Sequence, residues 1–351
     1  MLFDAAILAV AFLTILLGAE LFTNGIEWVG KKLDLAEGAV GSVLAAVGTA
    51  LPETMIPLIA ILITGGAAAN EVGVGAILGA PFMLSTLAMF VTGIAVIWVA
   101  RRRPRGDEML VNTAVLIHDV RTFVLAYALA VGTAFLPADL VWPRWAVGVL
   151  LIGLYAWYVR GHLRAEPSTG SDDLAPLRLH RLDGGRAADP VQDPRLRIVT
   201  FQVLVALGCI IVGAYAFVGA VEDIAYNLGV DGALLALIIA PIATELPEKF
   251  NSILWVRQGK DTLAMGNITG AMVFQSAIPT FVGLVFSSSH WVVTEASFLS
   301  FASAGIAFAA CAAIFLPMVA RRRLNGRGLL IGGVFYVGYI GLVVARLAGS
   351  D

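Results

Sequence analysis

Ten apolar stretches, each long enough to cross a lipid bilayer, constrain this chain more than any other feature. A membrane-spanning helix needs about 20 mostly apolar residues, and this chain of 351 residues is 59% hydrophobic and only 14% charged. A soluble domain has too little interior to bury that much apolar surface. The sequence therefore predicts an all-α integral membrane protein with ten transmembrane helices, at residues 4–29, 36–65, 71–99, 113–136, 141–160, 198–220, 230–257, 262–286, 292–319 and 327–346.

Basic residues are concentrated on alternate segments between these stretches. Nineteen lysines and arginines fall on one side, and only Arg144 and Arg346 fall on the other. Because basic segments beside spanning helices stay in the cytoplasm, both termini are predicted outside. The start, MLFDAAILAV, lacks the basic region of a cleavable signal peptide. The first helix is therefore expected to remain in a multi-pass protein of the bacterial cell (inner) membrane.

One polar segment divides the chain. Residues 161–197 are rich in Pro, Gly, Asp and Arg and keep no apolar period, so they are predicted to form a cytoplasmic polar linker, largely disordered. Five predicted spans precede the linker, in residues 1–160, and five follow it, in residues 198–351. We therefore expect two units of five helices each.

The two units carry related sequences. Residues 18–53 align without gaps to residues 213–248 at a constant offset of 195, with ten identical positions, and residues 71–83 match residues 262–274. Since five helices carry the chain across the membrane, the second unit must be inserted upside down relative to the first. Inverted repeats of this kind are common in secondary transporters, which bind substrate near the midplane on interrupted helices.

Both repeats place Leu-Pro-Glu deep inside a predicted span, ending at Glu53 and Glu248. An unpaired charge at that depth costs at least about 2.5–3.5 kcal/mol, which indicates a functional role. Each proline also frees the carbonyl four residues earlier, at Gly48 and Ala243. Carboxylate, hydroxyl and carbonyl oxygens together suit Na⁺ or Ca²⁺. The simpler alternative is that the prolines only kink the helices and that neighbouring amides satisfy the glutamates.

These motifs resemble the cation/calcium exchanger superfamily, which includes the sodium/calcium exchangers. Repeats of that family carry Gly-Thr-Ser-Leu-Pro-Glu and then, on the next helix, a Gly-Asn-x-x-Gly-Ser-Asn-type segment. This chain has GTALPE and IATELPE, followed by GAILGAP and GNITGAM. The resemblance implies an ion site lined by the side chains of Thr49, Glu53, Thr244 and Glu248 and by backbone carbonyls around Val47 and Ile242, with Asn267 as a ligand or a close neighbour.

The chain departs from the family pattern at four positions. Pro81 and Met272 stand where family members offer an amide or carboxylate oxygen, and Ala50 and Glu245 replace serines. The missing oxygens argue against several Na⁺ sites around one central divalent site. Glu245, by contrast, adds a carboxylate to the candidate metal ligands.

Three arrangements of Glu245 are open. Glu245 and Glu248 are three residues apart and could share a proton, because two close carboxylates cannot both ionise easily. Lys249 follows Glu245 by four residues, the spacing of an ion pair within a helix, which would leave Glu53 and Glu248 as the effective pair. In the third arrangement the Lys249 ammonium enters the pocket as a tethered cation.

Other polar residues receive no role in ion binding. Asp119, flanked by His118 and Arg121, is expected at the cytoplasmic mouth of the fourth span, and no histidine is assigned a function. Asn24 is expected to face an aqueous vestibule.

We therefore expect a secondary antiporter that exchanges Ca²⁺ or a related cation for Na⁺ or H⁺. The first and sixth spans are expected to slide across a core of the second, third, seventh and eighth. Its partners are inorganic cations and the bilayer. No phosphate-cradling loop for a nucleotide is present, no cofactor is expected, and the net charge of −2 argues against nucleic acid. Alternatives are a proton-coupled or monovalent cation exchanger and a transport-inactive membrane sensor. An intramembrane enzyme is disfavoured, because no nucleophile is placed beside the glutamates.

Overall fold

The structure is a computed structural model that describes residues 2–165, 174–186, 193–227 and 246–348. Helices dominate it, as predicted, and eight of the described helices are long and apolar enough to cross a membrane. These eight overlap eight of the ten predicted spans. The predicted span at 36–65 is broken into short helical pieces, and of the span at 230–257 the structure describes residues 246–257.

The helices greatly outnumber the strands along the chain. In order, the elements are α1 (Leu2–Lys32), η1 (Ala39–Ala45), α2 (Ala46–Thr49), α3 (Leu51–Leu58), η2 (Ile59–Thr64), α4 (Ala67–Met83), η3 (Leu84–Ala88), α5 (Met89–Val99), η4 (Ala100–Arg102), β1 (Glu108–Met109), α6 (Thr113–Gly132), η5 (Thr133–Phe135), α7 (Trp142–Leu163), η6 (His180–Arg186), α8 (Leu196–Asn227), α11 (Leu246–Arg257), α12 (Asp261–Phe286), α13 (Phe298–Arg321), β2 (Leu324–Asn325), α14 (Gly326–Leu329) and α15 (Ile331–Ala348).

Helix α12 forms the centre of the protein. In its most apolar 18-residue stretch 83% of the residues are buried, more than in any other described span, and α4, α6, α7, α11 and η1 all pack against it. Glycines allow the closest approach: a Cβ at Gly270 would overlap the backbone of Ser42 in η1. Small residues at such positions let membrane helices pack backbone to backbone.

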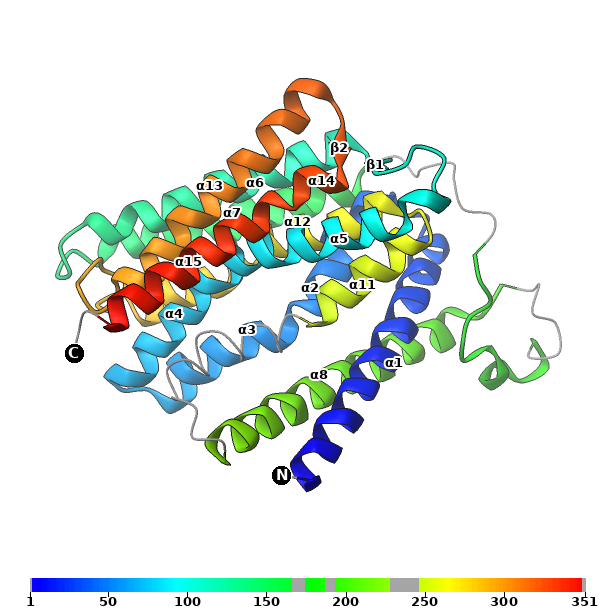
Figure 1. Cartoon of the computed structure of the whole chain (residues 1–351), viewed down its shortest axis with the longest axis horizontal. Helices are drawn as coiled ribbons and strands as arrows, with labels where there is room; N and C mark the ends of the chain where they lie inside the picture. Colours follow the sequence, from blue (N-terminus) through cyan, green and yellow to red (C-terminus); the bar gives the residue numbers. More distant parts are fainter. Residues whose placement is uncertain (1, 166–173, 187–192, 228–245, 349–351) are drawn as a thin grey trace.

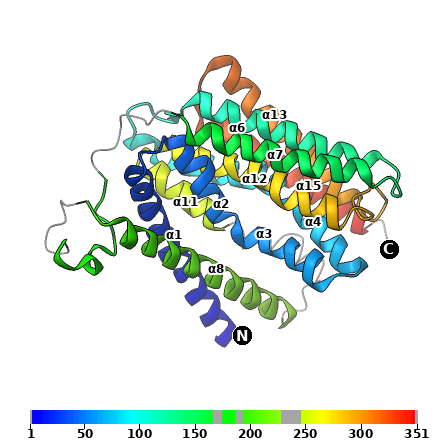
Figure 2. The same ribbon diagram turned by 180° about the vertical axis from the view of Figure 1, so that it is seen from behind.

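Helices α1 and α8, which correspond to the predicted first and sixth spans, lie side by side along one flank of the molecule (Figures 1 and 2). Their contact is reciprocal. A Cβ at Gly18 would lie 2.9 Å from Ile210, and a Cβ at Gly213 would lie 2.9 Å from Ile15. At the offset of 195 between the repeats, Gly18 corresponds to Gly213 and Ile15 corresponds to Ile210. A self-complementary contact of this kind is the signature of a two-fold axis, here between the halves of one chain.

The second predicted span is interrupted beside its Leu-Pro-Glu motif. Helix α2 ends at Thr49, Ala50 has a ψ angle of −1°, and α3 begins at Leu51. Pro52 explains the break, since it has no N–H to bond to the carbonyl of Gly48. The wide turns of η1 and η2 flank this region, and π-helical turns of this type are frequent at functional sites.

The basic segments lie together on one side of the helices, which we call the linker side. The strands β1 and β2 pair antiparallel there, Arg103 bonds to Asp261, and Lys260 bonds to Glu27. These contacts join loops and helix ends that lie far apart in the sequence, at one end of the molecule (Figure 1). The orientation of this side in the membrane stays a prediction.

Part of the linker is folded, against the expectation of disorder. Residues 174–186, which we call the strap, pack on the linker-side ends of α1 and α8. Leu177 is 1% exposed and contacts Trp28 and Val199. The Asn24 side chain accepts a hydrogen bond from the backbone N–H of Arg178 at 3.0 Å and is buried, so the expected exposure of Asn24 to a vestibule is wrong. The prediction failed because the strap packs on the two helices, where the side chains of Asn24 on α1 and Gln202 on α8 accept hydrogen bonds from its backbone N–H groups. The polar composition of the strap does not indicate this packing.

The strap is continued by an ion-pair cluster at residue 193. Lys31 and Lys32 each lie 3.2 Å from a carboxylate oxygen of Asp193. Slight burial opposes ionisation, but the hydrogen bonds and charges of the two lysines outweigh it and lower the pKa of Asp193. The end of α1 is therefore fastened to the segment that leads into α8.

Candidate functional site

The candidate site begins at the break in the second span, where Thr49 is fully buried. Its hydroxyl oxygen lies 3.1 Å from Oδ1 of Asn267 on α12 and 3.1 Å from the carbonyl of Ala45. The hydroxyl has one proton and donates it to one of these two acceptors. Three oxygens from the two predicted repeats therefore converge, and the role of Thr49 and Asn267 in ion binding stays a prediction.

Glu53 lies one turn beyond the break and is 8% exposed. The amide nitrogen of Gln275 on α12 lies 3.4 Å from a carboxylate oxygen of Glu53, 3.3 Å from the hydroxyl of Thr54 and 3.5 Å from the carbonyl of Ala50. One amide thus faces three oxygens around the break. Gln275 was not predicted as a site residue, although its place two turns beyond Asn267 on the same helix is a signal for it.

The second Leu-Pro-Glu motif is described only in part. Ile242, Thr244 and Glu245 lie outside the described residues, and so does the side chain of Glu248, whose backbone lies in the first turn of α11. The convergence of Glu53 with Glu248 and the choice among the three arrangements of Glu245 therefore remain predictions. Lys249 is described and is 4% exposed.

Asn251, on α11, is a second residue that was not predicted from the sequence. It is fully buried, and within the described part of the chain neither its amide nitrogen nor its amide oxygen has a hydrogen-bond partner. Such a group costs roughly 1–3 kcal/mol when left unsatisfied. It lies three residues after Glu248, which on a helix places the two on neighbouring positions of one face. A buried amide there is available to a cation.

The first repeat offers fewer oxygens on its third span than the second repeat offers on α12. Pro81 is buried in α4 and Met272 is buried in α12. Neither side chain contains an oxygen, so neither position contributes a side-chain ligand. Ala76 occupies the place that corresponds to Asn267. The polar contacts of the first repeat are therefore made to α12, and the site is asymmetric.

Asp119 departs furthest from the position expected of it. It was expected at the mouth of the fourth span but is fully buried. Its Oδ2 accepts hydrogen bonds from Ser42 at 2.8 Å and from Thr269 at 2.6 Å. Its Oδ1 accepts from Tyr158 at 2.9 Å and lies 3.0 Å from Nε2 of His162. Four helical elements meet at this carboxylate, and His162, which was assigned no role, is one of its partners.

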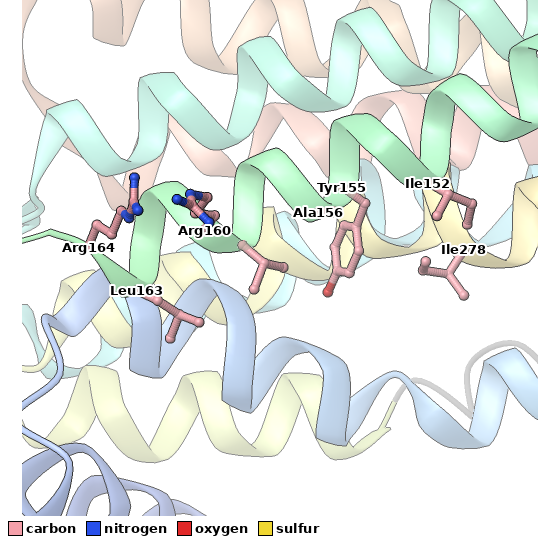
Figure 3. A pocket seen from close by; sticks show the side chains of 8 residues that line it. Ile152, Tyr155, Ala156, Arg160, Leu163, Arg164 and Ile278 are labelled. Atoms are coloured by element: carbon pink, nitrogen blue, oxygen red, sulfur yellow. The ribbon is translucent and has the colours of Figure 1, made fainter.

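A surface hollow of about 590 Å³ lies along α7, at residues other than those around Thr49 and Glu53 (Figure 3). Apolar side chains such as Ile152 and Ile278 line one end, and Arg160 and Arg164 stand at the other. An apolar wall that ends in basic residues is typical of a helix surface that faces lipid and reaches the cytoplasmic interface. The hollow is therefore not the ion site.

Comparisons with known proteins agree on one family. The family model described as sodium/calcium exchanger protein matches residues 3–162 and 198–348. CaxA of Alkalimonas amylolytica, which is named as an antiporter, is 23% identical over 294 residues, covering 82% of each chain. The inner membrane protein YrbG of Escherichia coli K12 is 24% identical over 280 residues, covering 79% of this chain and 78% of YrbG.

Solved structures of the sodium-calcium exchanger NCX_Mj share the fold. The structure soaked with 100 mM Na⁺ and 10 mM Sr²⁺ has a TM-score of 0.71 and 15% identity and covers 96% of this chain and 97% of the exchanger. The structure soaked with 2.5 mM Na⁺ and 10 mM Sr²⁺ has a TM-score of 0.72 and 16% identity, with 97% and 98% covered. At this identity the likeness establishes the fold and leaves the ligands to be argued from this chain.

Proposed function

This chain belongs to the sodium/calcium exchanger family, and on that premise we propose that it is a secondary antiporter that moves Ca²⁺ in exchange for Na⁺ or H⁺. The observation that carries the proposal is the contact between Thr49 and Asn267. It brings oxygens of both repeats together beside a broken helix, and hard cations such as Ca²⁺ and Na⁺ take oxygen ligands. Glu53 supplies a buried carboxylate next to them.

The proposed transport cycle uses two rigid parts. Helices around α12 hold the oxygens, while α1 and α8 form a separate pair on the flank (Figure 2). We propose that this pair slides across the site and exposes it to one side of the membrane at a time. Transport is then coupled because the pocket holds one ion or the other, and the protein rarely switches access from one side to the other while the pocket is empty. Glu53 and Glu248 are the proposed carboxylates of this pocket, with Thr244, Glu245 and the carbonyls of Val47 and Ile242 around them.

A second candidate is an exchanger of monovalent cations or protons without Ca²⁺ specificity. The buried Pro81 and Met272 favour it, because Ca²⁺ takes six to eight oxygen ligands and each of these positions contributes none. The two candidates share the site and differ in the ion.

Flux measurements separate the two. Ca²⁺ uptake into proteoliposomes is driven in turn by a Na⁺ gradient and by a pH gradient, with the full chain and with Glu53→Gln and Glu248→Gln. We expect one gradient to drive uptake and both variants to abolish it. Glu295→Gln is the control, since the Glu295 side chain is 94% exposed. Na⁺ flux driven by a pH gradient, with no Ca²⁺ flux, would favour the second candidate; if no gradient moves either ion, the proposal is wrong.

A further inference from the structure

The buried pair of Asp119 and His162 lies outside the proposed ion site and has its own chemistry. Asp119 is fully buried and His162 is 5% exposed, with Nε2 of the histidine 3.0 Å from Oδ1 of the carboxylate. Three hydroxyls, from Ser42, Tyr158 and Thr269, complete the shell of the carboxylate. The hydroxyls donate to the carboxylate, and Nε2 of His162 donates as well when it carries a proton, so the pair is treated as a unit that exchanges one proton.

The charge of this pair depends on one proton. With the imidazole protonated, carboxylate and imidazolium cancel; with the imidazole neutral, the pair carries a net charge of −1. Histidine is the side chain that changes charge in the range between about pH 5 and 8. His162 is in the last turn of α7, at the linker side.

The pair touches the helices that carry the proposed ion ligands. Ser42 precedes Thr49 by seven residues along η1 and α2, and Thr269 follows Asn267 by two residues on α12. With a rise of about 1.5 Å per residue, the carboxylate lies on the order of 10 Å from the oxygens at Thr49. At an effective dielectric constant of about 20, one unit charge at that distance changes the affinity for a monovalent cation by about tenfold.

The neighbouring titratable groups are few. On α6, the ring of His118 lies 5.4 Å from that of His162 and 5.5 Å from that of Tyr158. On α7, Tyr155 stacks on Tyr158, and the arginines at 160 and 164 are exposed. From η1 and α12 the pair receives only the hydroxyls of Ser42 and Thr269. Gly38 faces Nδ1 of His162, and the adjacent Glu37 is turned toward Thr262 and Lys260. The imidazole of His118 is thus, among the described residues, the nearest further histidine to the pair.

We propose that Asp119 and His162 form a proton-binding site that is linked to the cation site by charge. Protonation of the pair removes a negative charge near the cation and weakens cation binding, while release of the proton strengthens it. Linkage is reciprocal, so a bound cation must favour proton release from His162. Proton binding and cation binding then oppose each other, although the proton and the cation are held by different residues. The inference rests on the proposed function and names H⁺ as an ion to which that function responds.

Two substitutions have opposite expected effects. His162→Gln keeps an N–H donor for Asp119 but leaves the pair at −1 at every pH. Because Ca²⁺ carries two charges, the tenfold effect on a monovalent cation is squared, so Ca²⁺ binding to the purified full chain, measured by calorimetry, is expected to be on the order of a hundredfold tighter than wild type at acid pH and equal to it at alkaline pH. Asp119→Asn removes the negative charge, so Ca²⁺ binding is expected to be on the order of a hundredfold weaker than wild type at alkaline pH. Any pH dependence that comes from Glu53 and Glu248 is shared by the wild type and both variants, so it does not produce the differences between them. Structural damage weakens binding and cannot account for a variant that binds more tightly.

A second measurement does not depend on transport. The chain has four histidines, so nitrogen-15 NMR of labelled histidine, assigned with His162→Gln, reads the protonation of His162 directly. We expect its signal to titrate and the midpoint to move to lower pH when Ca²⁺ is added. A His162 signal that does not titrate overturns the inference whatever the calorimetric result. So does a titration that Ca²⁺ or Na⁺ leaves unmoved while either cation binds. If neither cation binds, the proposed function fails, and with it the linkage, although the proton site is still read by its own titration.

Discussion

Thr49 and Asn267 are separated by 218 positions in the sequence, yet their side-chain oxygens lie 3.1 Å apart in the core of the protein. Both residues are fully buried. One comes from the helix that breaks at Ala50 and the other from α12, the most enclosed helix of the described chain. This contact joins the two halves at the point where backbone carbonyls are freed, and it is the structural basis of the proposed cation site.

Asn267→Ala should lower the affinity for the transported cation by at least about tenfold, because a hydrogen bond or ligand bond to a charged group contributes roughly 1.5–3 kcal/mol. Asn267→Asp should restore or increase affinity, since it keeps an oxygen and adds a charge. Calorimetric titration with Ca²⁺ and with Na⁺ measures both. The matched control is Asn70→Ala. The Asn70 side chain donates a hydrogen bond to the carbonyl of Gly66, one turn earlier on the chain. Equal losses in the control and in Asn267→Ala would remove Asn267 from the site.

Asn251→Leu should leave the protein at least as stable as the wild type and yet impair transport. The amide is buried without a partner among the described residues, and an apolar group of similar shape avoids that desolvation cost. If the amide serves a cation, transport should fall several-fold while the thermal unfolding temperature holds or rises. Ser252→Ala provides the contrast, since it removes a bond to the carbonyl of Ala264 and should cost about 1 kcal/mol. Unchanged transport by Asn251→Leu would make Asn251 a packing residue.

Gly18→Ala and Gly213→Ala should have similar effects, because each Cβ meets the equivalent isoleucine at 2.9 Å. We expect each to separate α1 from α8, to cost about 1–3 kcal/mol of stability and to slow transport. Gly208→Ala on α8 is the control, since a Cβ there meets nothing within 4 Å. Thermal unfolding in detergent and flux in proteoliposomes supply the two readouts. A large effect at one glycine and none at the other would contradict the two-fold relation.

Leu177→Asp should release the strap from α1 and α8. Leu177 is the buried apolar contact of the strap with Trp28, and a carboxylate cannot be buried there without a partner. Cleavage by trypsin after Arg178 or Arg181 should become faster, while the unfolding temperature of the helical core changes little. Leu182→Asp is the control, because Leu182 lies in the same segment but is 57% exposed. Equal cleavage rates for both variants would show that the strap is not held by this contact.

Cysteine labelling tests the orientation. Ser289 and Gln258 are both exposed and lie at opposite ends of α12, in the segments that connect it to α13 and α11. The positive-inside rule places Ser289 outside and Gln258 in the cytoplasm. A membrane-impermeant thiol reagent applied to intact cells should label Ser289→Cys and spare Gln258→Cys, with both labelled after lysis. The reverse pattern would invert the proposed topology.

Local sequence features determined the parts of this protein that depend on composition and on covalent geometry. Apolar length fixed the spans, so that the predicted stretch at 71–99 corresponds to a described span from Asn70 to Arg102. Pro52 fixed the break after Thr49, since a missing N–H acts in any tertiary setting. The offset between the repeats also matched Gly18 with Gly213, which occupy equivalent places in the contact between α1 and α8.

Only the tertiary structure decided which buried polar groups meet. A helix that is apolar on all sides carries no stripe to show which face points inward, so the sequence could not pair Ser42 and Thr269 with Asp119 or Thr49 with Asn267. For the same reason Asp119 was placed at a mouth, where a lone charge is easiest to accommodate. Its burial became possible because hydroxyls and an imidazole from three other helical elements surround it. That compensation exists only once the helices have packed.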